Sequence, residues 1–137
     1  MDILEYGGMM AIRVDFEYDE ERNILFSFDH AELKTKEDVD QFFQIYEEKL
    51  RGLNRKVYAI SNIDDLKIHP EVAEYYGERV KGFLADFFLG HARYATDYEA
   101  RVMLRNAYLR AKVPAHIFDT KEEALTAIEE MKGKEQR

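Results

Sequence analysis

The stretch KVYAISNIDDLKIHPEVAEYYGERV, Lys56 to Val80, decides the fold. Its first part, Val57–Ile60, is a short apolar run rich in residues that favour strands. The polar residues that follow predict a loop from Asn62 to His69, and the helical pattern that Pro70 opens predicts a helix from Pro70 to about Leu89. Ligands and partners of open α/β sheets usually bind beyond the carboxyl ends of the strands, so we expect any site to lie at this loop.

The flanking sequence continues the alternation of strands and helices. Apolar patterning predicts further strands at Met10–Tyr18, Ile24–Phe28, Ala92–Ala95 and Val113–Phe118. Capping boxes are expected at Thr35 with Asp38, Thr96 with Glu99 and Thr120 with Glu123, each at the start of a helix. The order is ββαβαβαβα, an α/β fold with a mostly parallel, mixed five-stranded sheet, an N-terminal β-hairpin and four helices.

Length and composition predict a single domain over residues 1–137, with a core from about residue 9 to 131. The formal charge of -8 disfavours nucleic-acid binding, because that requires a basic surface. The absence of cysteine excludes disulfides and thiolate chemistry. No signal peptide and no apolar run of about 20 residues is present, so we expect a cytoplasmic protein without membrane insertion.

The element order and the ending IFDTKEEALTAIEEM, Ile117–Met131, resemble the SpoIIAA-like or STAS domain family of anti-sigma-factor antagonists. The resemblance implies a regulatory, protein-binding domain. In those antagonists a phosphorylatable Ser or Thr begins the second helix, where this chain reads Ile68, His69, Pro70, Glu71. No Ser or Thr occurs between Asn62 and Ala95, so the phosphorylation switch does not carry over.

Three residues of the predicted loop, Asp64, Asp65 and His69, could pair carboxylates with an imidazole for acid–base catalysis, or hold an anion at the helix end. The alternative is that they are ordinary loop and cap residues. The four histidines are too widely spaced to predict a metal site.

Two helical features could form a binding surface. Arg101 and Arg105 share one helix face that could contact a phosphate or an acidic partner, unless it is simply solvated. Tyr75 and Phe88 lie away from the inward stripe of the preceding helix, which favours a dimer surface or the wall of a pocket for an apolar ligand.

These observations favour a non-catalytic protein-interaction or regulatory module that acts through a protein partner or self-association, such as a homodimer. One alternative is a carrier or sensor of a small apolar or anionic ligand, and another is an enzyme using the loop carboxylates and histidine. No catalytic residue, cofactor or metal is assigned. The candidate binding residues are Asn62, Asp64, Asp65, His69, Tyr75, Phe88, Arg101 and Arg105.

Overall fold

The computed structural model describes residues 12–135, and within them the predicted element order is confirmed. Met10, where the first strand was predicted to begin, lies outside the described residues. The strands are β1 (Arg13–Asp19), β2 (Ile24–Leu33), β3 (Val57–Ile68), β4 (Phe88–Tyr94) and β5 (Ile117–Phe118). The α-helices are α1 (Lys36–Leu53), α2 (Ala73–Phe87), α3 (Tyr98–Arg110) and α4 (Lys121–Glu135).

The described strands form one mixed sheet in the order β1-β2-β3-β4-β5. β1 and β2 make the predicted antiparallel hairpin, and every later pair is parallel. β5 is shorter than the predicted strand over 113–118, and it pairs only with Arg93 and Tyr94. The edge of β4 over residues 88–92 therefore has no neighbouring strand on that side among the described residues.

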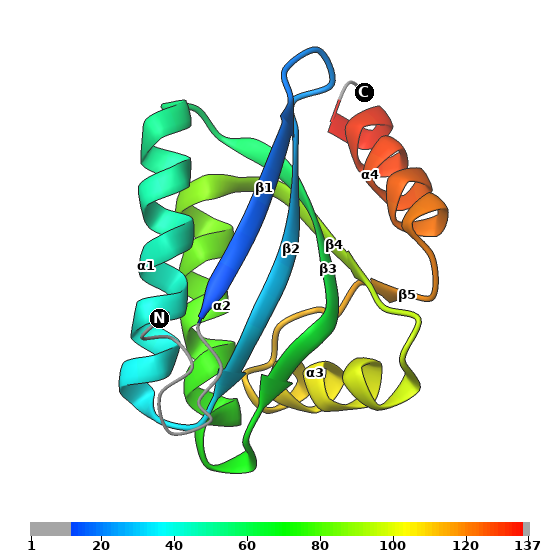
Figure 1. Ribbon diagram of the computed structural model, residues 1–137. Helices are drawn as coiled ribbons and strands as arrows, with labels where there is room; N and C mark the ends of the chain where they lie inside the picture. Colours follow the sequence, from blue (N-terminus) through cyan, green and yellow to red (C-terminus); the bar gives the residue numbers. More distant parts are fainter. Residues whose placement is uncertain (1–11, 136–137) are drawn as a thin grey trace, which may run out of the picture.

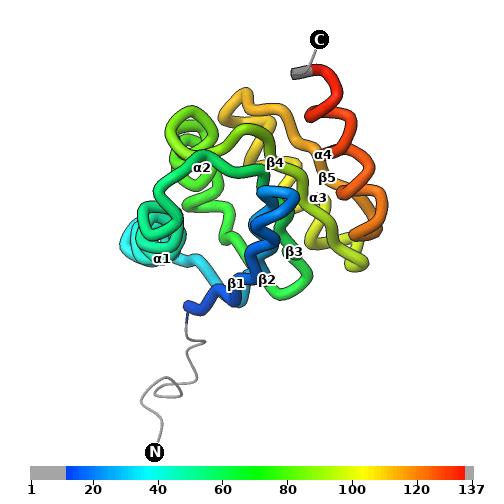
Figure 2. The backbone as a smooth tube through the Cα atoms, turned by 90° about the horizontal axis from the view of Figure 1, so that it is seen from above, coloured from blue at the N-terminus to red at the C-terminus, as the bar shows by residue number. Residues whose placement is uncertain are grey.

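The sheet is covered unequally on its two faces. Figure 1 shows α1 and α2 on one side of the sheet, α3 running across its lower end, and α4 on the other side, and Figure 2 shows the same layers from above. Side chains from α1, α2 and α3 pack in one large buried cluster. α4 covers the opposite face through a much smaller cluster, which includes Ala124 and Ile128. No described helix is long and apolar enough to cross a bilayer.

The loop predicted from Asn62 to His69 is wrong, because β3 continues to Ile68. The extended β2 reaches Leu33 and provides a parallel partner for this second half of β3. Buried Ile63, Leu66 and Ile68 anchor the strand there, while the polar side chains between them are exposed. The burial of these three apolar side chains thus outweighs the turn propensity of the polar residues between them.

The helix predicted to run from Pro70 to about Leu89 is also revised. Pro70–Val72 forms a 3-10 helix, α2 follows from Ala73, and the chain enters β4 directly at Phe88. Phe88 is therefore a buried strand residue, and not part of an exposed helix face as predicted. Neither Gly, Pro nor a polar cluster separates α2 from β4, so the usual signal for a helix end is missing.

Two of the three predicted helix starts agree with the structure. Thr35 and Asp38 make the full capping box, and the Thr120 hydroxyl accepts the Glu123 amide. The prediction that Thr96 caps this helix is wrong, because Asp97 is the N-cap of α3. Its side chain accepts a hydrogen bond from the backbone amide of Ala100.

Candidate functional site

A row of polar side chains crosses the sheet face that α1, α2 and α3 cover. Ser27, Ser61 and Arg93 are register neighbours on β2, β3 and β4, and all three are 2% exposed. Asp29, two residues beyond Ser27 on β2, is equally buried. Polar groups buried in this way require partners, so this row marks a departure from an ordinary apolar core.

Hydrogen bonds join the β2 and β3 members of the row to α1. The Tyr46 hydroxyl donates to Oδ1 of Asp29 in a short hydrogen bond. The same hydroxyl lies 2.7 Å from Oγ of Ser27, which lies 2.8 Å from Oγ of Ser61. Asp29 is thereby fixed at one end of a connected polar network.

His91 and Arg93 continue this network on β4. Nε2 of His91 lies 3.0 Å from Oγ of Ser61, and an Nη2 group of Arg93 lies 2.5 Å from Nδ1 of the same imidazole. The guanidinium can only donate, so Nδ1 accepts and the imidazole proton is placed on Nε2, toward Ser61. Arg93 also stacks over the Tyr108 ring, with its Cζ 4.2 Å from the centroid.

Burial shifts the titration of the ionisable groups in the network. It raises the pKa of Asp29 to about 7, although the Tyr46 hydrogen bond and the Arg93 charge act in the opposite direction. Burial, with the charge of Arg93 and then His116, lowers the pKa of His91 well below its ordinary value. The histidine is therefore neutral, as its hydrogen bond from Arg93 requires, and Asp29 changes charge near neutral pH.

The Tyr108 hydroxyl is completely buried and makes no hydrogen bond of ordinary geometry to a described residue, although Tyr76 and Arg93 lie close enough to counteract the rise in its pKa that burial causes. It borders an internal cavity of about 20 Å³ between the sheet and the three helices, which Asp29, Ser61, His91 and Arg93 also line. That volume is about the size of one water molecule. Buried polar groups converging on a cavity are typical of binding sites.

A larger surface pocket lies beside the open edge of β4, with a volume of about 380 Å³. We call it the β4-edge pocket. His91 and Arg93 line both this pocket and the internal cavity, so they form a common wall between the two. The remaining lining residues of the β4-edge pocket are Leu84, Leu89, Gly90, Pro114, His116, Met131 and Lys134.

The predicted acid–base residues do not share a site. Oδ1 of Asp64 accepts the amides of Thr96 at 2.8 Å and Asp97 at 3.0 Å, so this carboxylate secures the turn before α3. These hydrogen bonds contribute to lowering its pKa. Asn62, also proposed, donates to the Asp64 side chain at 3.2 Å.

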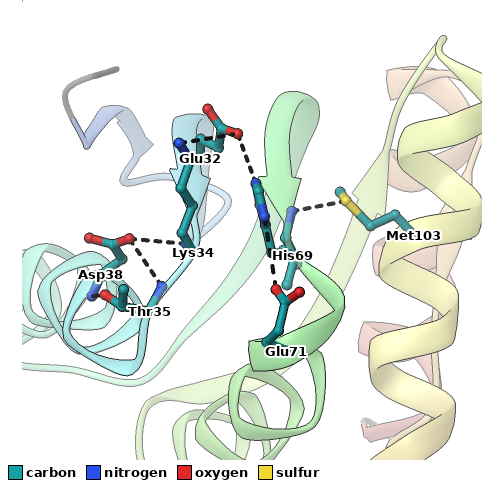
Figure 3. Close-up of polar contacts among 8 residues, drawn as sticks. Glu32, Lys34, Thr35, Asp38, His69, Glu71 and Met103 are labelled. Carbon is teal, nitrogen blue, oxygen red and sulfur yellow. Dashed lines mark hydrogen bonds and ion pairs between the residues drawn. The ribbon is translucent and has the colours of Figure 1, made fainter. Parts of the chain in front are cut away.

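The other two members of that proposed set have separate partners on β2. Asp65 lies 2.7 Å from Nδ1 of His30. His69 makes polar contacts with Glu32 and Glu71 (Figure 3), in which Nε2 lies 2.8 Å from Oε2 of Glu32 and Nδ1 lies 3.9 Å from Oε2 of Glu71. The geometry therefore divides the proposed set among three contacts, and it gives no shared cavity for acid–base chemistry.

The predicted helical candidates are also dispersed. The Tyr75 hydroxyl donates to Asp40 at 2.5 Å, on the outer side of α2. Arg101 donates to the Ala95 carbonyl at 2.6 Å and pairs with Asp119, whereas Arg105 is exposed on α3. Tyr75, Arg101 and Arg105 line neither the internal cavity nor the β4-edge pocket, whereas Phe88, which was predicted as a pocket wall, does line the internal cavity.

Sequence reasoning did not identify the buried polar network. Its one signal is the pair Ser27 and Asp29 inside the apolar run of β2, two residues apart and hence on one face of the strand. Within residues 12–135, no group of three His, Asp or Glu side chains is arranged to hold a metal ion.

Comparisons with known proteins give a fold. No family model and no curated protein matches the chain. A solved structure of an uncharacterised DUF3478-family protein with a SpoIIAA-like fold, from Shewanella loihica PV-4, matches with a TM-score of 0.55 and 20% sequence identity. The match covers 88% of this chain and 98% of that chain. This chain therefore has a SpoIIAA-like fold.

Proposed function

We propose that this chain is a non-catalytic regulatory module that binds a small molecule in the β4-edge pocket. The observation that carries the proposal is the common wall formed by His91 and Arg93, where a surface pocket meets a buried, titratable polar network. Pockets of small-molecule sites span about 300–1,000 Å³ and combine apolar walls with a few polar groups. The β4-edge pocket has that size and that composition.

The absence of a shared acid–base arrangement at Asp64, Asp65 and His69 supports a binding role over a catalytic one. A module of this kind acts by changing its surface or its stability when the ligand is bound. We therefore favour the ligand-binding alternative drawn from the sequence over the protein-interaction hypothesis. The pocket lies at the edge of β4, however, and not beside Tyr75, where the sequence suggested it.

A pocket-filling substitution tests this function. Leu89 lines the pocket and is 41% exposed, so Leu89→Trp adds bulk there without disturbing the buried core. Leu109→Trp, at a site on α3 that is 74% exposed, is the matched control. Ligand-observed NMR with a library of small organic molecules should find compounds that bind the wild type and L109W but not L89W. A library without such compounds would contradict the proposal.

One observation favours a second candidate function, self-association through α3. Tyr98 and Leu109 are 68% and 74% exposed, and their spacing places them on one helix face with Arg105 between them. Tyr and Arg are enriched at interface hot spots, so the exposed residues of this face have the composition of an interface.

Sedimentation velocity tests this second candidate. The wild type should form a dimer, and Leu109→Glu should be monomeric. A wild type that stays monomeric up to millimolar concentration would remove self-association from consideration.

A further inference from the structure

We infer that the molecule bound in the β4-edge pocket is a small organic carboxylate, whose anionic group pairs with the guanidinium of Arg93. This inference rests on the proposed function and specifies its ligand class. It is carried by a separate observation, the charge of Arg93, which forms no direct ion pair with a described residue.

Arg93 is only 2% exposed, yet its guanidinium forms no direct ion pair with a described residue, and Asp29 acts on it only from a distance. Within residues 12–135, no carboxylate oxygen lies within 4.0 Å of its guanidinium nitrogens. Its contacts are the hydrogen bond to His91, the stacking on Tyr108 and a polar interaction with the Tyr108 hydroxyl. A guanidinium has five N–H donors, so most of its hydrogen-bonding capacity remains for another molecule.

Asp29 offsets the charge of Arg93 only in part. Its Oδ1 is bound by the Tyr46 hydroxyl, and its carboxylate forms no ion pair with Arg93 within 4.0 Å. Burial also favours its neutral form, so the acid contributes little negative charge below neutral pH. An isolated buried charge is strongly unfavourable unless a partner compensates it, and a ligand carboxylate supplies that partner.

The pKa values of two neighbouring histidines respond to the positive charge of Arg93. The charge of Arg93 contributes to lowering the pKa of both His91 and His116, after the larger effect of burial. Both imidazoles lie in the wall of the β4-edge pocket. The pocket is therefore a region of positive potential in an acidic protein, and such a region selects anions.

The geometry of the guanidinium favours a carboxylate among anions, because the planar fork can form two parallel hydrogen bonds to its two oxygens. The apolar walls formed by Leu84, Leu89, Pro114 and Met131 favour an organic body attached to that group. Lys134 adds a further positive charge in the lining of the pocket. The ligand class is thus a monocarboxylate with a compact aliphatic or aromatic body.

The experiment compares each carboxylate with its uncharged amide of nearly the same shape. Isothermal titration calorimetry would measure binding of benzoate against benzamide, and of hexanoate against hexanamide, to the wild type. A charge-assisted, bidentate contact should make at least one carboxylate bind about 10-fold or more tightly than its amide. Equal binding of acid and amide would overturn the inference while leaving the proposed function in place.

Variants at Arg93 identify the residue responsible. Arg93→Met should abolish the preference for the carboxylate, whereas the exposed Arg55→Gln should retain it. Arg93→Lys keeps the charge without the planar fork, so it should keep a reduced preference, and it serves if the Met variant does not fold. A preference that persists undiminished in a folded Arg93 variant would overturn the assignment.

Failure of the inference can be separated from failure of the proposed function. If neither acids nor amides bind, and the compound library also yields no ligand lost in Leu89→Trp, the small-molecule function itself fails. If neutral compounds bind and are lost in that variant but no carboxylate is preferred over its amide, the function stands and the carboxylate class is wrong.

Discussion

Replacing Asp29 with Asn should make the domain more stable at alkaline pH. Asp29 is buried, and its pKa is raised from an ordinary value of 3.8 to about 7, chiefly by burial. Asn has nearly the same shape as the protonated acid, and its carbonyl oxygen can still accept the Tyr46 hydrogen bond. The substitution therefore removes the charge and keeps the contact.

The size and sign of the effect follow from proton linkage. A carboxyl with a raised pKa is protonated more readily in the folded state, so its contribution to stability is complete below pH 3.8 and is lost as the pH rises to about 7. The difference between the two pKa values, 3.8 and about 7, corresponds to about 4 kcal/mol of stability lost over this whole pH range. Between pH 5 and pH 8, the stability of Asp29→Asn relative to the wild type should rise by about 3 kcal/mol.

Urea unfolding followed by circular dichroism at pH 5, 6, 7 and 8 would measure this difference. Taking the variant minus the wild type at each pH removes the contributions of groups that titrate in both proteins. Asp86→Asn, which removes an exposed carboxyl, is the control, and Asp29→Asn should give the larger change of this difference between pH 5 and pH 8. A pH-independent difference for Asp29→Asn would refute the claim that burial shifts this acid.

Two further predictions use matched pairs of residues. An alanine Cβ at Gly77 would lie 2.6 Å from the Ala107 carbonyl oxygen, so Gly77→Ala should lower the free energy of unfolding by about 1–3 kcal/mol. Gly82 in the same helix has nothing within 4 Å of that position, so Gly82→Ala should raise it by about 0.5–1 kcal/mol in urea unfolding. Tyr46→Phe should cost about 1–3 kcal/mol, because the buried carboxyl loses its donor. Tyr108→Phe removes a hydroxyl that makes no hydrogen bond of ordinary geometry, so the thermal midpoint of this variant should equal or exceed that of the wild type. A loss of stability as large as that of Tyr46→Phe would show that the Tyr108 hydroxyl does have a partner.

The element order and the mixed sheet could be predicted from the sequence because they depend on local periodicity and caps. Thr35 illustrates this, since its capping box involves residues only three apart. The ends of β3 and α2 could not be predicted in the same way. The polar residues after Asn62 extend β3 only because the second half of β2 lies beside them, and that contact is distant in sequence.

The site was predicted at the wrong place for the same reason. Asp64, Asp65 and His69 are close in sequence, yet each is bound by a different distant partner. Ser27 and Arg93, by contrast, are far apart in sequence and share one row of the sheet. That row depends on the register of three strands, which no single segment determines.

The unequal cover of the two sheet faces has a kinetic consequence. α4 is held by a small buried cluster, whereas α1, α2 and α3 share the large one. Local opening requires less free energy where fewer apolar contacts are broken, so the amide hydrogens of α4 should exchange with solvent before those of α1. Met131 and Lys134 of α4 also line the β4-edge pocket, and each opening of this helix removes one wall of it. A ligand of the proposed kind should therefore slow the hydrogen exchange of the α4 amides, because it binds only when that wall is in place.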